Sequence, residues 1–170
     1  MPSSEPLTTP NDLQPPTDQL ALRRALGAFA TGVTIVTTMC DAEPTGFTAN
    51  SFTSVSLEPP ILLVCLAHTA ASYELFRRSD TFAVNVLSAD QQDTAMTFAQ
   101  RGADKFSAVD WHAGARGAPL IDGSLARFDC AMEDRVTAGD HDILLGRVLG
   151  FACRPGPALL YHGGSFSRLG

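Results

Sequence analysis

The chain has 170 residues and a mass of 18.0 kDa, the size of one domain rather than two. Apolar residues make up 45% and charged residues 18%, a composition that excludes wholesale disorder. The formal net charge of −6 argues against nucleic acid or an anionic membrane as the main partner, because both bind through a basic face.

The N-terminal segment, residues 1–17, contains five prolines among polar residues and is predicted to be a solvated tail. It lacks the basic and apolar regions of a signal peptide. The longest uninterrupted apolar run, residues 61–67, is far shorter than the ~20 residues of a membrane helix. We therefore expect a cytoplasmic protein without a membrane contact, and one folded domain over residues 18–170.

The folded part opens with a predicted helix. Asp18 is a candidate N-cap, and apolar residues recur at helical spacing from Leu22 to Ala30, which predicts a buried face. Gly32 is expected to end this helix. Two further helices are predicted. A short one covers residues 71–78, and a second runs to about Gln100, with Ser88 and Gln91 as a capping box at its start.

Most of the remaining chain has the pattern of strands. The predicted strands are residues 33–39, 45–55, 61–67, 81–87, 126–136, 143–154 and 159–162. The run 61–67 is apolar throughout, which predicts burial on both faces. The clearest alternation places one set of residues on a single face: Ala126, Phe128, Cys130, Met132 and Val136. Because strand follows strand with only a few helices inserted, the order favours an antiparallel barrel with covering helices over a parallel sheet.

Several common motifs are missing from the sequence. It contains no glycine-rich dinucleotide fingerprint, no P-loop, no zinc-binding helix motif and no nucleophile elbow. The four cysteines (Cys40, Cys65, Cys130 and Cys153) are widely spaced and are expected to be small hydrophobic residues rather than metal ligands or disulfides. If the protein is an enzyme, we expect its chemistry to come from an organic cofactor and not from a metal.

The segment from Gly46 to Ser56 is unusually polar for a strand. Six of its eleven residues carry a hydroxyl or a carboxamide, and two phenylalanines lie among them. Such a segment suits an exposed strand. It also suits the wall of a site that offers short hydroxyls and backbone N–H groups to a flat polar ring and a phosphate. Composition leaves both interpretations open.

This segment is part of a longer block, residues 46–60, that together with residues 29–38 resembles the short-chain flavin reductases, the reductase partners of two-component flavin monooxygenases. The further matches occur in the same order along the chain: residues 82–87, 104–106, 139–141 with Gly146, and 161–164. The resemblance extends from about Leu20 to Leu169.

This resemblance implies a split β-barrel, which agrees with the barrel that the strand pattern predicts. It also implies a homodimer with the flavin near the subunit interface. The implied reaction is hydride transfer from NADH or NADPH to FAD or FMN, and the reduced flavin then leaves for a partner monooxygenase. We expect FAD, with FMN as the alternative, and NADH rather than NADPH, because no arginine cluster for a 2′-phosphate is evident near His141.

The resemblance also implies roles for individual residues. The wall along the flavin ring edge and ribityl chain is expected to include Thr48, Ala49, Asn50, Ser51 and Ser54. Cys65, Leu66 and Ala67 are expected to lie against the ring. Ser72 and Lys105, with Phe106 beside it, are expected to bind the phosphate. His141 is expected beside the nicotinamide.

Two other functions fit the same barrel. One is a non-catalytic flavin-binding or sensor protein, against which the retained corner Gly139-Asp140-His141 counts. The other is a split barrel that resembles pyridoxamine phosphate oxidase or that handles haem. A flavin reductase is the preferred hypothesis.

Overall fold

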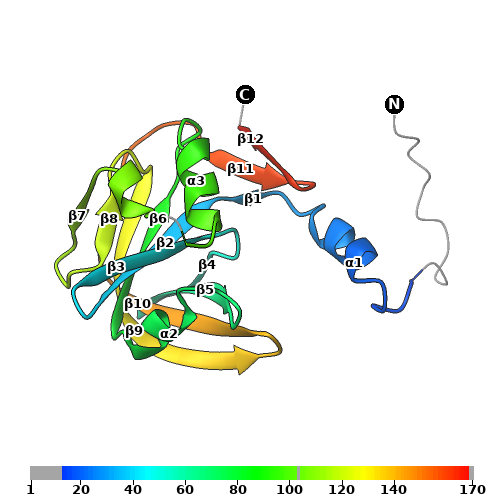
Figure 1. The fold of residues 1–170 in the computed structure, drawn as a ribbon, viewed down its shortest axis with the longest axis horizontal. Coiled ribbons are helices and arrows are strands. Elements are labelled where there is room, and N and C mark those ends of the chain that lie inside the picture. The colour runs from blue at the N-terminus through cyan, green and yellow to red at the C-terminus, as the bar shows by residue number, and fades with distance from the viewer. Residues whose placement is uncertain (1–12, 103, 169–170) are drawn as a thin grey trace.

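The structure is a computed structural model that describes residues 13–102 and 104–168 (Figure 1). Residues 1–12 of the predicted tail lie outside the described residues. Residues 13–17 are exposed and contain no helix or strand, as expected for the end of that tail.

The first helix, α1 (Gln19–Leu26), begins where the sequence predicts. The Oδ1 atom of Asp18 accepts hydrogen bonds from the backbone N–H groups of Leu20 and Ala21, at 2.9 and 3.1 Å, which confirms the N-cap. The helix ends at Gly27, earlier than expected. Its predicted burial is wrong, because no residue of α1 is buried and Leu26 and Phe29 are 66% and 78% exposed. The helix lies to one side of the sheets (Figure 1).

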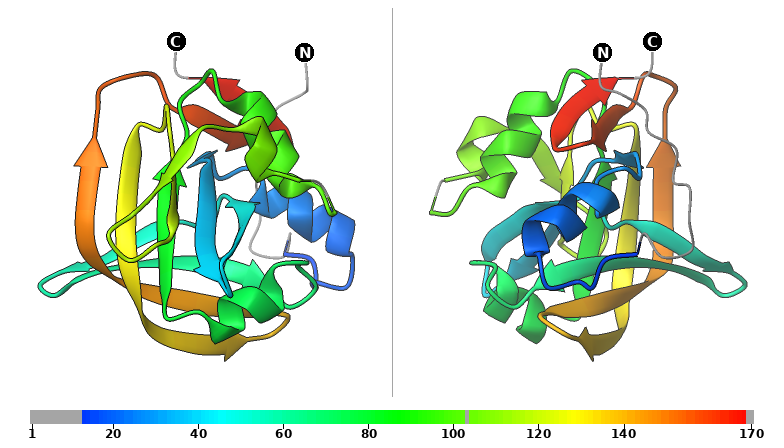
Figure 2. Two further views of the ribbon diagram at one scale, coloured as in Figure 1. Left: turned by 60° about the vertical axis from the view of Figure 1, so that its left-hand side comes forward. Right: turned by 90° about the vertical axis from the view of Figure 1, so that its right-hand side faces the viewer.

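Seven strands form one antiparallel sheet in the order β3-β2-β6-β9-β10-β5-β4. These strands are β2 (Thr34–Cys40), β3 (Glu43–Ala49), β4 (Thr53–Leu57), β5 (Pro60–Ala67), β6 (Thr81–Val86), β9 (Ala126–Ala138) and β10 (His141–Cys153). The edge strands β3 and β4 are consecutive in the chain, so residues 50–52 connect the two ends of the sheet and the sheet curls on itself (Figure 2). This mainly β, antiparallel architecture confirms the predicted fold class.

Smaller elements complete the fold. A three-stranded sheet contains β1 (Thr31–Gly32), β11 (Leu159–His162) and β12 (Ser165–Arg168). A separate hairpin contains β7 (Trp111–Ala113) and β8 (Pro119–Ile121), and a short 3₁₀ helix, η1, covers Phe106–Ala108. The sequence analysis did not predict β1, β7, β8 or β12, because each has only two to four residues.

Three predicted strands differ from the observed ones. The expected strand 45–55 is divided into β3 and β4, since residues 50–52 cross from one end of the sheet to the other. The run 61–67 is buried on one face only, with Leu62, Val64 and Leu66 inside and the residues between them half-buried. Val136 is 43% exposed, because the end of the β9–β10 hairpin extends beyond the core.

The other two helices are α2 (Tyr73–Arg78) and α3 (Gln92–Ala99). The Oε1 atom of Gln91 accepts from the N–H of Ser88 at 3.1 Å, so the glutamine half of the predicted capping box forms. The hydroxyl of Ser88 instead donates to Asp90 and to the carbonyl of Gly123. As a result α3 begins at Gln92, later than expected.

Two hydrophobic clusters hold the helices on the sheet. Val36 of β2 packs in a cluster with Phe76 of α2, and its neighbour Ile35 packs in a second cluster with Phe98 of α3. Because successive side chains of a strand point to opposite faces, β2 separates these two clusters. This arrangement fixes the ends of α2 and α3 relative to β3 and β5, where the candidate site lies.

The described residues contain no helix that is long and apolar enough to cross a membrane. They also contain no group of three or more His, Cys, Asp or Glu side chains that could hold a metal ion. All four cysteines are free: Cys40 and Cys130 are buried, Cys65 is half-buried and Cys153 is exposed.

Candidate functional site

A cavity of about 330 Å³ lies where the ends of β3, β5 and α3 meet the start of β10. Its lining includes ten of the twelve residues proposed from the sequence: Thr48, Ala49, Asn50, Ser51, Cys65, Leu66, Ala67, Ser72, Lys105 and His141. The antiparallel register of β5 and β10 places Ala67 opposite His141. Segments that are far apart in the sequence therefore form one cavity, which we call the central cavity.

Two of the proposed residues do not line the central cavity. Ser54 is exposed on β4, where it pairs with Leu62, because the chain leaves the cavity at residues 50–52. Phe106 packs edge-on against Phe98 and Trp111, with ring centroids 5.1 and 5.6 Å apart, and lines an adjoining cavity instead. The structure gives both residues a place outside the central cavity.

The hydroxyls of Thr48 and Ser51 are not free donors, contrary to the expectation from the sequence. The Thr48 hydroxyl donates to the carbonyl of Ala95 at 2.6 Å and so ties β3 to α3. The Ser51 hydroxyl accepts from the backbone N–H of Cys65 at 2.9 Å and donates to the carbonyl of the same residue at 3.5 Å. The side chain of Asn50 is exposed and forms no hydrogen bond to another described residue, so its amide is available to a ligand.

Lys105 is a partly buried cation in the wall of the central cavity. Its ammonium donates to the carbonyls of Phe98 and Gly46, at 2.9 and 3.2 Å, and so caps the last turn of α3. Burial lowers the pKa of Lys105. An ammonium group has three N–H donors, so one remains for a ligand.

Two more side chains lie beside Lys105. Arg101 also lines the cavity, and it donates to the carbonyl of Thr69 at 2.9 Å. Ser72 precedes α2, is buried and forms no capping hydrogen bond through its side chain. Two cations and a hydroxyl suit a phosphate group, which agrees with the role predicted for Ser72 and Lys105.

His141 is the first residue of β10, rather than part of a loop. Its Nδ1 lies 2.6 Å from Oδ1 of Asp140, and this hydrogen bond holds the pKa of Asp140 below its usual value. The imidazole is 44% exposed, and its Nε2 has no partner among the described residues. Asp140 therefore orients the ring at the edge of the cavity through Nδ1 and leaves Nε2 without a partner among the described residues.

Asp142, which the sequence analysis did not single out, organises the polar contacts behind the cavity. Its buried carboxylate accepts hydrogen bonds from His68 Nε2, the Tyr73 hydroxyl and the Thr137 hydroxyl, at 2.8, 2.9 and 2.9 Å. The His68 hydrogen bond contributes most to lowering the pKa of Asp142. These contacts fix residues 68–73, which carry Ser72, to β9 and β10.

The only signal for Asp142 in the sequence was its position directly after His141 and the resembling block 139–141. Alternation along β10 sends the two side chains to opposite sides of the strand, so one lines the cavity and the other binds the supporting network. Sequence spacing does not identify Tyr73 and Thr137 as partners of this carboxylate.

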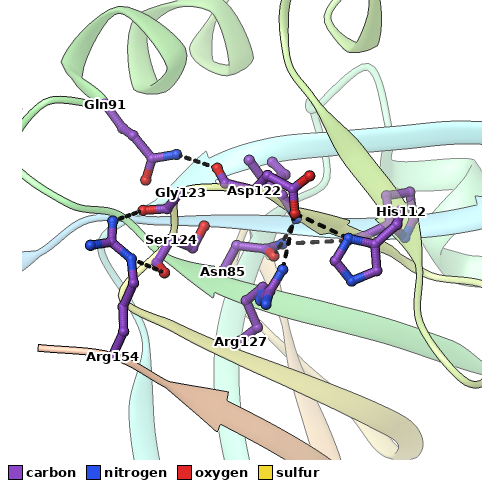
Figure 3. A network of polar contacts seen from close by, with 10 residues as sticks. Asn85, Gln91, His112, Asp122, Gly123, Ser124, Arg127 and Arg154 are labelled. Carbon is purple, nitrogen blue, oxygen red and sulfur yellow. Dashed lines mark hydrogen bonds and ion pairs between the residues drawn. The ribbon is translucent and has the colours of Figure 1, made fainter.

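A second polar network lies around the segment between β8 and β9 (Figure 3). Asp122 binds His112 and Arg127 at 3.1 and 3.2 Å, and the fully buried Asn85 accepts from the N–H of Ile121 at 2.8 Å. Arg154 donates to the carbonyls of Gly123 and Ser124. The contacts shown in Figure 3 are all made within the protein, and they fix this segment to the sheet.

The central cavity can therefore hold an anionic ligand that contains a flat ring. Cys65 and Ala67 are half-buried and offer an apolar wall, Asn50 offers an amide, and Lys105 with Arg101 offers positive charge. The side chain of Leu66, which was also expected against the ring, is only 1% exposed and packs in the core instead. The cavity has no pair of carboxylates and no nucleophile activated by a base among these lining residues. This donor set fits a flavin phosphate, and it suits a reaction in which positioning matters more than acid–base catalysis.

Comparisons with known proteins agree with this interpretation. A family model described as "Flavin reductase like domain" matches residues 26–170. The stachydrine N-demethylase reductase subunit Stc3 of Rhizobium meliloti (strain 1021) is 49% identical over 135 residues, which cover 79% of this chain and 59% of that protein. The reductase subunit HsaB of a flavin-dependent monooxygenase from Rhodococcus jostii (strain RHA1) is 42% identical over 153 residues, covering 89% of this chain and 78% of that protein.

A solved structure is also similar. The NADH:FAD oxidoreductase SgcE6 of Streptomyces globisporus C-1027, in complex with NAD and FAD fragments, matches with a TM-score of 0.88 and 44% identity, over 94% of this chain and 97% of that one. Two relatives are much longer than this chain, which spans 59% of Stc3 and 43% of another protein from the same bacterium.

Proposed function

Because the chain belongs to the flavin reductase-like family, we propose that it is an NADH-dependent flavin reductase. It transfers a hydride from NADH to FAD, or to FMN, and supplies the reduced flavin to a partner monooxygenase. The observation that carries this proposal is the single cavity in which ten of the twelve residues expected from the family meet. The names of the similar proteins, which are reductase subunits and an NADH:FAD oxidoreductase, support the same reaction.

The flavin is a substrate of this reaction, and its N5 accepts the hydride from C4 of the nicotinamide. Cys65 and Ala67 pack against the ring, and Asn50 binds its polar edge. Lys105 and Ser72 bind the phosphate, with Arg101 as a second cation. Since Thr48 and Ser51 use their hydroxyls within the protein, they act by fixing the wall of the cavity rather than by binding the flavin.

His141 positions the nicotinamide over the flavin. Asp140 holds the imidazole through Nδ1, so Nε2 is the atom that faces the second substrate. Hydride transfer between stacked rings needs no proton at this position, so the main contribution of the protein is to hold the two rings together.

The proposal is tested by steady-state oxidation of NADH and NADPH with FAD, FMN and riboflavin. We expect NADH to be consumed with FAD or FMN, and faster than NADPH. If neither nicotinamide is consumed with any flavin, the reductase function is wrong. Flavin binding without oxidation of NADH then supports the non-catalytic flavin-binding alternative. An absorbance spectrum of pyridoxal phosphate or haem supports a split barrel that resembles pyridoxamine phosphate oxidase or that handles haem.

The proposal includes a homodimer with the flavin near the subunit interface. Helix α1 supports this, because it carries an apolar side without a buried residue, and Leu20 and Leu26 are 60% and 66% exposed. A second copy of the chain is the partner we propose for these side chains. Light scattering is expected to give twice the 18.0 kDa of the chain. A mass of one chain across a wide concentration range would rule the dimer out.

We also keep the expectation that the protein is cytoplasmic. Four free cysteines, one of them exposed, suit a compartment in which thiols stay reduced.

A further inference from the structure

A second cavity, of about 560 Å³, adjoins the central cavity at Asn50, which lines both. It lies between the end of α1 and the turn that joins β11 to β12, where the N–H of Gly163 donates to the carbonyl of Gly27 at 2.9 Å. We call it the arginine cavity, because Arg23 and Arg24 line it. A further cavity that is lined by both Asn50 and Tyr161 links it to the central one.

The two arginines are available to a ligand. Both are exposed in the last turn of α1, and neither forms an ion pair within residues 13–102 and 104–168. Two arginines without acidic partners thus line one cavity in a chain whose net charge is −6. Guanidinium groups bind phosphate oxygens in a bidentate manner, so this pair suits a diphosphate.

The rest of the wall suits a nucleoside. Phe29 is 78% exposed and Tyr161 is half-buried, so each offers an aromatic surface to a flat base. The hydroxyl of Thr31 is buried and has no hydrogen-bond partner among the described residues. A buried hydroxyl without a partner costs free energy, and the hydroxyl of a bound ribose would satisfy it.

We propose that the arginine cavity binds the adenosine diphosphate half of a dinucleotide whose other half lies in the central cavity. Arg23 and Arg24 bind the diphosphate, Phe29 or Tyr161 stacks on the adenine, and Thr31 binds the ribose. The inference rests on the proposed reductase function for the identity of the dinucleotide, since both NADH and FAD contain this group.

The arrangement of the cavities distinguishes the two dinucleotides. Ser72 and Lys105, which we assign to the flavin phosphate, line a different adjoining cavity, together with Gly102 and Asp104. The phosphate end of the flavin is therefore assigned to this other cavity and not to the arginine cavity. We assign the adenosine diphosphate of NADH to the arginine cavity on this ground. FAD is the other source, and the experiment separates the two.

The test compares the double variant Arg23→Ala/Arg24→Ala with a matched control, Arg77→Ala/Arg78→Ala. The control pair also consists of adjacent arginines in the last turn of a helix, α2, but its partners are Glu74 and Asp41 and it lines none of these cavities. Both variants remove the same charge, so a general electrostatic effect would appear in both.

The first measurement is calorimetric titration with ADP itself, which does not depend on turnover. We expect ADP to bind the wild-type protein and the control variant with similar affinity, and the Arg23/Arg24 variant at least ~10-fold more weakly. Circular dichroism shows whether the variants are folded. If ADP does not bind the wild-type protein, or binds the Arg23/Arg24 variant equally well, the proposal is wrong.

The second measurement assigns the dinucleotide through KM values of the same proteins. If NADH occupies the cavity, KM for NADH rises in the Arg23/Arg24 variant, while KM for FAD and for FMN does not. If FAD occupies it, KM rises for FAD and not for FMN, which lacks the adenylate group. Unchanged KM values for both dinucleotides contradict the proposal. If the wild-type protein binds ADP through these arginines but oxidises no NADH, the proposed ADP site is supported and the reductase function is wrong.

Discussion

Replacing Asp142 by asparagine removes the charge from a carboxylate that joins three parts of the fold. His68, Tyr73 and Thr137 each donate to it at 2.8–2.9 Å, and its side chain is only 7% exposed. A hydrogen bond to a charged group contributes about 1.5–3 kcal/mol, against about 0.5–1.5 kcal/mol for a neutral one. With three such bonds weakened, we expect Asp142→Asn to lower the free energy of unfolding by about 2–3 kcal/mol. Asp142→Ala leaves three donors unpaired and is expected to cost about 3–5 kcal/mol.

The effect of Asp142→Asn should depend on pH in a defined direction. Because the pKa of Asp142 is lowered in the folded protein, its stabilising contribution is complete above the unfolded value of about 3.9. The contribution is lost as the pH falls through the lower folded pKa. The difference in stability between the wild-type protein and Asp142→Asn should therefore be largest near neutral pH and shrink in acid.

Urea unfolding at neutral and acidic pH measures both effects. The matched control is Asp140→Asn, which removes a neighbouring carboxylate that is 93% exposed and binds only His141 among the described residues. We expect a much smaller loss of stability there. We also expect a raised KM for flavin in Asp142→Asn, because residues 68–73 carry Ser72. If Asp142→Asn unfolds like the wild-type protein at neutral pH, the carboxylate does not have the anchoring role that its contacts suggest.

Three other substitutions test the site and its support. Lys105→Ala should weaken FMN binding by roughly 10- to 100-fold, because it removes a charge-assisted hydrogen bond to the phosphate. Fluorescence titration should show a smaller loss for riboflavin, which has no phosphate, and an equal loss would assign Lys105 another role. His141→Ala should lower kcat/KM for NADH by about 10- to 100-fold, mainly through KM, while flavin affinity barely changes. Unaltered NADH kinetics would make His141 a solvated residue at the edge of the sheet. Gly146→Ala should destabilise the fold by about 1–3 kcal/mol in thermal or urea unfolding, because its Cβ would lie 2.4 Å from the ring of Phe82. Its control is Gly150→Ala on the same strand, where no heavy atom lies within 4 Å of the added Cβ and little loss is expected.

Patterns within short stretches of sequence predicted much of this protein correctly. The cap at Asp18 and the succession of strands reflect the preferences of neighbouring residues, whereas the predicted alternation along β9 does not hold, because Asp129 and Cys130 are both buried and Val136 is exposed. The cap and the strands therefore follow from residues that are close in the chain. The resemblance to flavin reductases added the site, since it named residues on five separate segments that the fold then brings into one cavity.

The tertiary structure decided what depends on contacts between distant segments. The apolar side of α1 is exposed because the helix lies to one side of the sheets, and helical periodicity alone does not predict where a helix packs. The hydroxyls of Thr48 and Ser51 are occupied because Ala95 and Cys65 lie against them, 47 and 14 residues away in the sequence. The network around Asp142 also joins segments that are distant in the sequence, and so does the cavity that Arg23, Arg24 and Tyr161 line. Whether a polar side chain is free to bind a ligand depends on its neighbours in space, and these are fixed only when the chain has folded.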